Sequence, residues 1–535
     1  MAMSTTLKTD FGEFRGKNGS GVVQYLGIKY ASLKDRLAVP EIVESYGEET
    51  VDATEYGPRC IAMDACQFEQ DMLIQQRLDI PKGPQMSGLD SLNLNITVPD
   101  IKIEKPLPVM VWIHGGGYMI GSNHWPQYDP SRLVIAAADQ NLPVIVININ
   151  YRLGAPGNLT SEELRKAGYP GNNSLRDQKC AFQWIKSHIG AFGGDPNNVT
   201  AFGESAGSIS VLTQLYSKEP LFNRAICMSG TPIMLKPLPP PVAEMAYGMM
   251  LKELGLENAT VEERIQRLLN IEPEELVAAT SLNIPLLPYL DGDMIPSAAS
   301  FEKLAGSSDQ LDFPVPGLKW CQDLMIGDCQ HDGQVFLFMG LAPRKAGIAA
   351  AFCASLTKNI SHPGAAEAVL AAYHITPETS DDTAMGAILS FVNDIAYYAP
   401  AVAYARVWPG KTFYYQFNEP NPWEGPAKGL ANHVLDAAFL FQNYNKKLSP
   451  EARKVAFSMA KDFVQFANEM APWNEFNDAK GNARTYGPSA SSITGMAENF
   501  AWGSGRNDAV FKLKEKGKVD LDELSLAWDK FLAGQ

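Results

Sequence analysis

Short apolar runs recur along the chain, and helix-prone segments separate them. Clear examples are residues 109–113, 199–202, 324–326 and 412–417, which are rich in β-branched and aromatic side chains. Apolar runs of this length, bounded by turn residues, are typical of the buried strands of a parallel sheet. The alternation of strands and helices predicts an α/β fold, with a large, mostly parallel central sheet flanked by helices.

Near the C-terminal end, Ser449-Pro450 precedes a segment whose apolar residues fall on one helical face. These residues are Val455, Met459, Phe463 and Phe466. Serine followed by proline is a typical helix start, so the segment predicts a long amphipathic helix that packs against the core.

The chain has no Pro/Ser-rich linker, internal repeat or low-complexity tract. We therefore expect residues 1–535 to form one domain. Insertions at about 60–90, 240–320 and 345–405 are expected to lie over the edge of the sheet that carries the chemistry.

Charge narrows the range of partners. The 535 residues include 45 basic and 60 acidic ones, which gives a net charge of −15. An acidic chain disfavours nucleic acid and anionic membrane surfaces. The first ten residues contain no apolar signal region, and no apolar run is long enough to span a bilayer. We expect neither a secretory signal nor integral membrane association.

The most informative motif is Gly-Glu-Ser-Ala-Gly at residues 203–207, between the strand-prone run 199–202 and a helix-prone one. Glycines on both sides allow a strained strand-to-helix turn that exposes the hydroxyl of Ser205. The same turn puts the N–H of Ala206 at a helix N-terminus, where it can donate to an oxyanion. The pattern predicts a nucleophilic serine.

A second motif, His114 followed by three glycines, comes directly after the strand-prone run 109–113. Uncovered glycine N–H groups, such as those of Gly116 and Gly117, suit an oxyanion hole built from main chain. A flexible glycine turn is the alternative. The presence of Ser205 downstream favours the catalytic interpretation.

A serine hydroxyl needs a base, and histidine suits this role. In chains with this elbow the base comes last, on a loop after a late strand. The loop after the strand-prone run 412–417 contains Pro, Gly and Asn and ends at His433. His433 is therefore the predicted base, with a surface histidine as the alternative.

Four blocks together resemble the type B carboxylesterase family, the cholinesterase-like branch of the α/β-hydrolases. They are YLGIKYA at 25–31, VWIHGGG at 111–117, NYRLG at 150–154 and FGGDPNNVTAFGESAG at 192–207. The likeness is dense from about residue 20 to 235, and islands follow at 291–292, 327–333 and 429–441. The resemblance implies Ser205 as nucleophile and the N–H groups of Gly116, Gly117 and Ala206 as oxyanion hole.

The resemblance also places the triad acid just before a glycine in the segment 327–333, which aligns Asp332. The family more often has Glu at this position. Asp328, which follows the strand-prone run 324–326, is the competing candidate. The third interpretation is that Asp328 and Asp332 are both solvated loop carboxylates.

Several other residues also have an expected role. The resemblance implies that Glu204 supports the triad, from a buried polar network. His114 precedes the glycine run, so it is expected to orient that loop by hydrogen bonding, with a metal ligand or a base as the alternative. Arg152 and Asp177 form either a structural ion pair behind the elbow or two solvated charges. Val434 stands where the family usually has Gly, so a slightly different backbone is expected there.

The cysteines indicate a reducing compartment. In secreted members of the family a disulfide clips a loop beside the site, and its first half resembles Cys60. Its partner position is Ser91 here, and the total of seven cysteines is odd. We expect free thiols and a cytoplasmic protein. Without the clip, the segment 60–90 (the flap) is expected to move more freely over the pocket mouth.

These observations predict a serine carboxylic-ester hydrolase that forms an acyl-enzyme on small to medium uncharged esters or lactones. An acyltransferase using the same site is the first alternative, and a non-catalytic cholinesterase-like interaction protein is the second. Cys321, Cys329 and His331 lack the paired spacing of a structural zinc site, so neither a metal nor another cofactor is predicted. Residues 282–290, which include Leu286, Leu287 and Tyr289, either line the acyl side or pack in the core.

Overall fold

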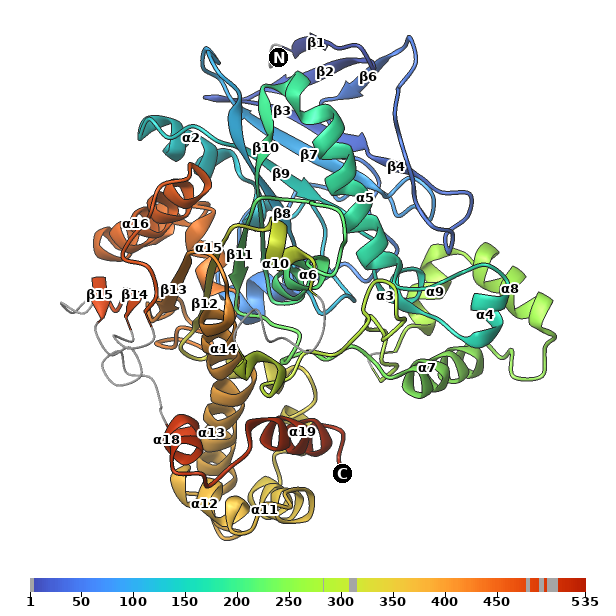
Figure 1. The fold of residues 1–535 in the computed structure, drawn as a ribbon. Helices are drawn as coiled ribbons and strands as arrows, with labels where there is room; N and C mark the ends of the chain where they lie inside the picture. Colours follow the sequence, from blue (N-terminus) through green and yellow to red (C-terminus); the bar gives the residue numbers. More distant parts are fainter. Residues whose placement is uncertain (1–3, 282, 307–314, 478–481, 490–494, 498–508) are drawn as a thin grey trace.

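The computed structural model describes residues 4–281, 283–306, 315–477, 482–489, 495–497 and 509–535. Leu282 and residues 307–314, which belong to the predicted insertion 240–320, lie outside the described residues. A large twisted sheet runs through the middle of the molecule, with helices on both faces (Figure 1).

Within the described residues the main sheet has 13 strands in the order β1-β2-β3-β7-β9-β8-β10-β11-β12-β13-β14-β15, with β6 beside β2. Their bounds are β1 Ser4–Lys8, β2 Glu13–Asn18, β3 Val22–Lys29, β6 Thr50–Ala53, β7 Asn93–Pro99, β8 Leu107–Ile113, β9 Ile145–Ile149, β10 Gly194–Glu204, β11 Arg224–Met228, β12 Asp323–Cys329, β13 Thr412–Phe417, β14 Ala483–Tyr486 and β15 Gly495–Ala497. A separate small sheet pairs β4 (Ala31–Ser32) with β5 (Glu41–Ile42).

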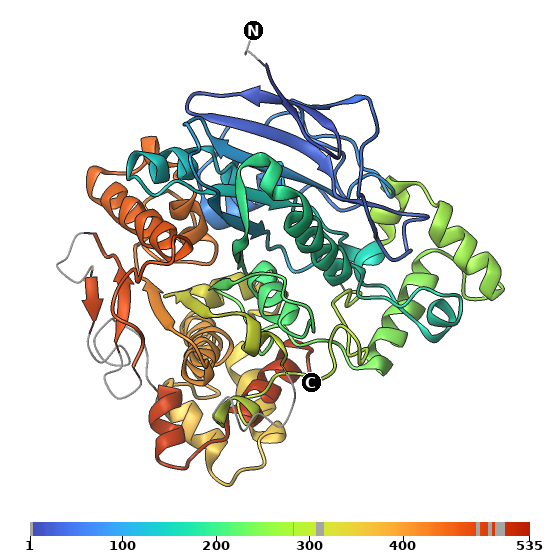
Figure 2. The same cartoon turned by 45° about the horizontal axis from the view of Figure 1, so that its top comes forward.

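The strands from β9 to β14 are parallel to their neighbours, and antiparallel strands extend the sheet at both ends. The predicted α/β class with a mostly parallel sheet is confirmed. Strand β13 has the predicted bounds. Strand β10 starts earlier than predicted, because Gly194 already pairs with Leu107 before a register shift leads to Val199. Figure 2 shows the antiparallel N-terminal strands at the far end of the sheet from the C-terminal helices.

Helices cover the two faces of the sheet. One face carries α2 (Ser131–Asp139), α15 (Leu435–Leu440) and α16 (Pro450–Ala467), and the other carries α5 (Asn173–His188), α6 (Ala206–Gln214) and α14 (Ala399–Val407).

Helix α16 is the long amphipathic helix predicted after Ser449. The Ser449 hydroxyl accepts a hydrogen bond from the N–H of Ala452 at 3.1 Å, as an N-cap does. The four predicted apolar residues of its inner face are all buried. The predicted core packing of this face is confirmed.

Two further groups of helices surround the sheet. Helices α7 (Pro240–Glu253), α8 (Val261–Asn270) and α9 (Pro273–Ala279) form a lobe with α4 (Glu162–Lys166) at one side. Helices α11 (Ile348–Asn359), α12 (Ala365–Ala372) and α13 (Asp381–Val392) form the second group. Helix α13 continues through the π-helix η8 (Asn393–Tyr398) into α14.

The C-terminal helices α18 (Ala509–Glu515) and α19 (Leu521–Leu532) join this second group, an arrangement that the sequence did not predict. Trp528 of α19 meets the ring of Phe336 at 5.0 Å, four residues after Asp332. The C-terminal segment therefore helps to cover the edge of the sheet at which Asp332 lies.

Short helical segments complete the connections. They are α1 Cys66–Phe68, η1 Glu69–Ile74, η2 Pro126–Tyr128, α3 Gly154–Asn158, η3 Ile189–Phe192, η4 Lys303–Ala305, α10 Gly317–Trp320, η6 Asp332–Leu337, η7 Ala342–Arg344 and η9 Asn445–Lys447. None of the helices in the described ranges is both long enough and apolar enough to cross a bilayer.

Candidate active site

Ser205 stands on a strained turn between β10 and α6. Its backbone has φ 55° and ψ −123°, a conformation that a residue with a side chain rarely adopts. The glycines beside it permit the turn. A Cβ on Gly207 would lie 1.9 Å from the carbonyl oxygen of Ile113, and one on Gly203 would lie 2.5 Å from the carbonyl carbon of Gly207. The predicted elbow is present.

The glycine loop after β8 packs directly against this elbow. A Cβ on Gly115 would lie 2.8 Å from the carbonyl oxygen of Glu204 and 3.1 Å from the Cβ of Ser205. Gly116 and Gly117 have φ of 97° and 60°. Within the described residues, the N–H groups of Gly116, Gly117 and Ala206 donate to no other group. These three donors are therefore unengaged, and the loop that carries two of them packs against the turn that carries the third.

His433 and Asp332 meet in the interior. His433 ends the loop that follows β13, and Asp332 begins η6 after β12. The Nδ1 of His433 lies 2.7 Å from Oδ1 of Asp332, and Oδ2 of Asp332 accepts from the N–H of Cys329 at 2.7 Å. Asp328 instead accepts from the hydroxyl of Tyr414 at 2.8 Å. The geometry brings Asp332, rather than Asp328, to the imidazole.

The backbone next to His433 is strained. Val434 has φ 75° and ψ −16°, although a β-branched residue strongly disfavours the left-handed region. The chain thus holds a conformation that favours glycine at a position occupied by valine. Surrounding packing must hold Val434 there, since it is only 2% exposed.

Glu204 lies on the other side of the imidazole. Its Oε1 is 3.1 Å from Nε2 of His433 but lacks the direction of a hydrogen bond, so the contact is electrostatic. Burial opposes protonation of His433, yet the charges of Glu204 and Asp332 outweigh it and raise the pKa of the imidazole to about 9. Burial raises the pKa of Glu204 well above its usual range, against the influence of His433.

The hydroxyl of Ser205 makes no hydrogen bond within the described residues, and none joins it to His433. Catalytic hydrogen bonds are often long or open in ligand-free enzymes and close when substrate binds. Because His433 already contacts the residue before Ser205, the imidazole stands at the elbow.

Three functional-site neighbours escaped the sequence analysis. Asp436 accepts from the Tyr415 hydroxyl at 2.8 Å, and burial together with the charge of Asp332 raises its pKa to about 6. Glu69 of the flap is buried, and its charge acts on Glu204. The ring of Tyr397 meets that of His433 edge-on at 5.5 Å. Only Asp436 left a local signal, as a charge three residues after the predicted base.

His114 packs behind the glycine loop. Its ring stacks on that of Tyr151 at 4.4 Å, and its Nδ1 lies 2.9 Å from the carbonyl oxygen of Gly115. Burial lowers the pKa of His114 to about 4, so the ring is neutral at physiological pH. These contacts suit a residue that orients the loop.

Arg152 and Asp177 form a fully buried, two-pronged ion pair. The Nη2 of Arg152 lies 2.6 Å from one carboxylate oxygen and its Nε lies 2.8 Å from the other. The solvated alternative for these two residues is therefore wrong.

All seven cysteines are free thiols in the structure. Cys60 and Ser91 are both buried, and the sulfur of Cys60 lies 3.0 Å from the carbonyl oxygen of Tyr151 and 4.0 Å from that of Ser91. The helix η1 of the flap extends only as far as Ile74, because Gln75 turns left-handed and ends it. Leu78 lies beyond the helix.

Comparison with known proteins agrees with this geometry. The model of the Carboxylesterase family matches residues 3–500. Para-nitrobenzyl esterase of Bacillus subtilis is 29% identical over 493 residues, which cover 87% of this chain and 90% of that protein. Acetylcholinesterase of Bungarus fasciatus is 32% identical over 334 residues, or 60% of this chain and 51% of that one.

A solved structure of a PNB esterase superimposes with a TM-score of 0.73 at 25% identity, covering 95% of this chain and 99% of that chain. The fold and the site thus define an α/β-hydrolase. The chain belongs to the carboxylesterase family, and it is a serine carboxylic-ester hydrolase.

The charge of Glu204 generates a testable prediction. His433, the predicted base, must be neutral to accept a proton, and a carboxylate beside its Nε2 favours the protonated imidazole. Glu204→Gln is therefore expected to lower the pKa of His433 and to move the acidic limb of kcat/KM toward lower pH by about one unit or more. The measurement is the pH profile of ester hydrolysis.

Glu419→Gln is the matched control, because Glu419 is also buried but hydrogen-bonds to Ser489. Its profile should coincide with that of the unmodified enzyme. An acidic limb that stays in place in Glu204→Gln would contradict the electrostatic role.

Proposed function

We propose that this esterase works through Ser205, His433 and Asp332, with the N–H groups of Gly116, Gly117 and Ala206 as the oxyanion hole. The observation that carries the proposal is the meeting of the strained serine, three unengaged backbone donors and a buried His–Asp pair. No cofactor is needed for this chemistry.

The Ser205 hydroxyl turns toward Nε2 of His433, gives up its proton there and attacks the ester carbonyl. The carbonyl oxygen becomes an oxyanion that the three N–H groups hold, and each such donor lowers a barrier of this kind by about 2.7–4 kcal/mol. His433 then returns the proton to the leaving alcohol. Asp332 stays ionised and stabilises the imidazolium.

Deacylation repeats these steps with water. A water molecule gives its proton to His433 and attacks the acyl carbon, and Ser205 leaves with the proton that His433 returns. Glu204 favours the imidazolium in both halves of the cycle, because its carboxylate lies 3.1 Å from Nε2.

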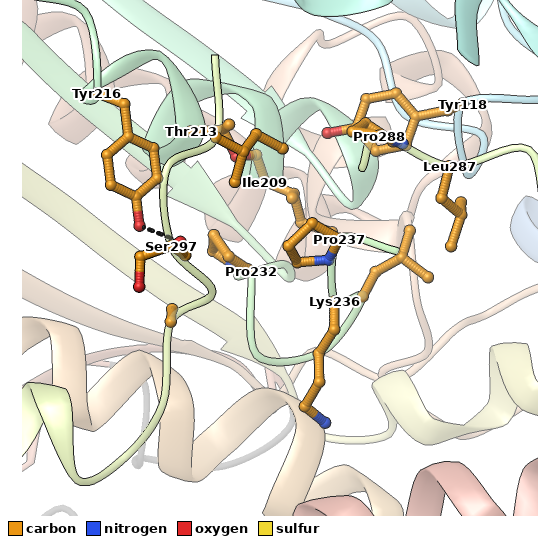
Figure 3. A pocket seen from close by; sticks show the side chains of 13 residues that line it. Tyr118, Ile209, Thr213, Tyr216, Pro232, Lys236, Pro237, Leu287, Pro288 and Ser297 are labelled. Carbon is orange, nitrogen blue, oxygen red and sulfur yellow. Dashed lines mark hydrogen bonds between the residues drawn. The ribbon is translucent and has the colours of Figure 1, made fainter. Parts of the chain in front are cut away.

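An apolar pocket lies against α6, the helix that follows Ser205. It begins one turn along α6 at Ile209 and is lined mainly by apolar side chains, among them Leu287 (Figure 3). Of the described lining residues only Lys236 is charged, and it extends away from the others to pair with Asp529 at 2.5 Å. Leu286 and Tyr289 are buried in the core instead. Small to medium uncharged esters remain the proposed substrates, and the apolar lining next to α6 supports only the absence of charge.

A reducing, cytoplasmic location is part of the same proposal. Its support is that all seven cysteines are free and buried, and that a serine occupies the position of the second clip cysteine.

Ser205→Ala tests the proposal directly. Alanine keeps the Cβ and therefore the same backbone strain, so the thermal midpoint should not change. Hydrolysis of a short p-nitrophenyl ester should fall by about 10⁶-fold in kcat, as expected when a catalytic serine is lost. Turnover that survives in the purified variant would reject Ser205 as nucleophile.

The two candidate acids give a matched pair of variants. Asp332→Asn replaces the carboxylate with a neutral amide that can donate to Nδ1 and favour the wrong tautomer, so kcat is expected to fall by about 10⁴-fold. Asp328→Asn is expected to keep nearly full activity, because Asp328 contacts Tyr414. Steady-state kinetics of both variants decide the assignment, and the reverse order of activities would overturn it.

A further inference from the structure

The last carbonyl groups of helix η1, in the flap, accept hydrogen bonds from side chains outside the flap. The last carbonyls of any helix lack donors within the helix. Here the Nδ2 of Asn432 donates to the carbonyl of Leu73 at 2.7 Å, and that of Asn421 donates to the carbonyl of Ile74 at 3.1 Å. Both asparagines belong to the loop that ends at His433. The flap is thus capped by the histidine loop.

Asn432 is the point where three catalytic segments meet. Its Nδ2 also reaches the carbonyl of His433 at 3.1 Å, and its Oδ1 accepts from Asn421 at 3.0 Å. Its backbone pairs with that of His331, the residue before Asp332. A side-chain amide supplies two donors and an acceptor at one place, which this junction uses in full.

A second contact holds the same two segments together. The Oε1 of Gln75, at the end of η1, accepts from the N–H of Ala427 at 2.7 Å, and its Nε2 donates to the carbonyl of Trp423 at 3.4 Å. The approach is close, since a Cβ on Gly425 would lie 2.2 Å from Oε1 of Gln75. Breaking such buried contacts is costly, because each freed group loses its partner without gaining water.

The other end of η1 is fixed near the catalytic charges. The carboxylate of Glu69 accepts from the hydroxyl of Tyr128 at 2.5 Å and from Nε2 of Gln127 at 3.0 Å. Its charge acts on both Glu204 and His433. A displacement of the flap would therefore change the surroundings of the imidazole as well as its support.

We propose that Asn432 is a positioning residue: it fastens the flap, residues 60–90, to the histidine loop, so that the inner turn of the flap fixes the place of His433. The inference rests on the proposed function, in which His433 is the base. The sequence analysis expected a looser flap once the disulfide was missing. In the structure the flap is held to the histidine loop by buried hydrogen bonds, which involve the side chains of Asn432, Asn421 and Gln75.

Asn432→Ala tests the proposal. We expect kcat to fall roughly 10- to 100-fold with little change in KM, because a displacement of about 1 Å in catalytic geometry costs on the order of 10²-fold. Asn173→Ala is the matched control. Asn173 is equally buried and donates to the carbonyls of Leu37 and Pro156, both at 3.1 Å and both outside the flap and the histidine loop. It should lose stability but keep kcat.

A disulfide provides the rescue. Ser91→Cys introduces a second thiol at the residue whose carbonyl oxygen lies 4.0 Å from the sulfur of Cys60. Oxidation is expected to close the flap at its base, and intact mass confirms the bridge. In the Asn432→Ala background, the bridged protein should regain most of kcat and lose it again on reduction.

The outcomes separate the two proposals. Full kcat in Asn432→Ala, an equal loss in Asn173→Ala, or a bridged variant that stays slow would overturn the role of Asn432. Turnover that persists in His433→Ala would instead refute the proposed function itself.

Discussion

The close approach of three strand ends underneath Ser205 is the constraint on which the site depends. The carbonyl of Ile113 at the end of β8 leaves no room for a Cβ at Gly207, and the backbone of Ser205 leaves none at Gly230 after β11. Within this space the chain can turn from strand to helix only through the strained geometry of Ser205. The same close packing brings the glycine loop after β8, at Gly115, into contact with Ser205.

The charges around His433 are the second constraint on the site. Four buried carboxylates, from Glu69, Glu204, Asp332 and Asp436, influence a single buried imidazole. This group raises the pKa of His433, and in the proposed mechanism it stabilises the imidazolium of each half-reaction. Asp332 also fixes the orientation of the ring through its hydrogen bond. The flap contributes Glu69 to this group of carboxylates. The flap therefore affects the charge around His433 as well as covering the site.

The sequence was sufficient to predict those parts of the site whose residues lie close together along the chain. The elbow, the glycine loop and β13 each carry their signal within a few residues, and their order along the chain is enough to infer the fold. The partners of His433 are different. Asn432, Glu69 and Tyr397 come together only through tertiary packing, and no short pattern marks them. The C-terminal helix α19 was missed for the same reason, since its partner Phe336 lies nearly two hundred residues away.

The central claim is that Ser205 becomes a nucleophile because His433 can take its proton. Covalent trapping with a fluorophosphonate, followed by peptide mass spectrometry, tests this most directly. The account predicts a single adduct on Ser205, formed at a rate that rises as His433 loses its proton and that collapses in His433→Ala. An adduct on another residue, or trapping that proceeds equally fast without His433, would contradict the account.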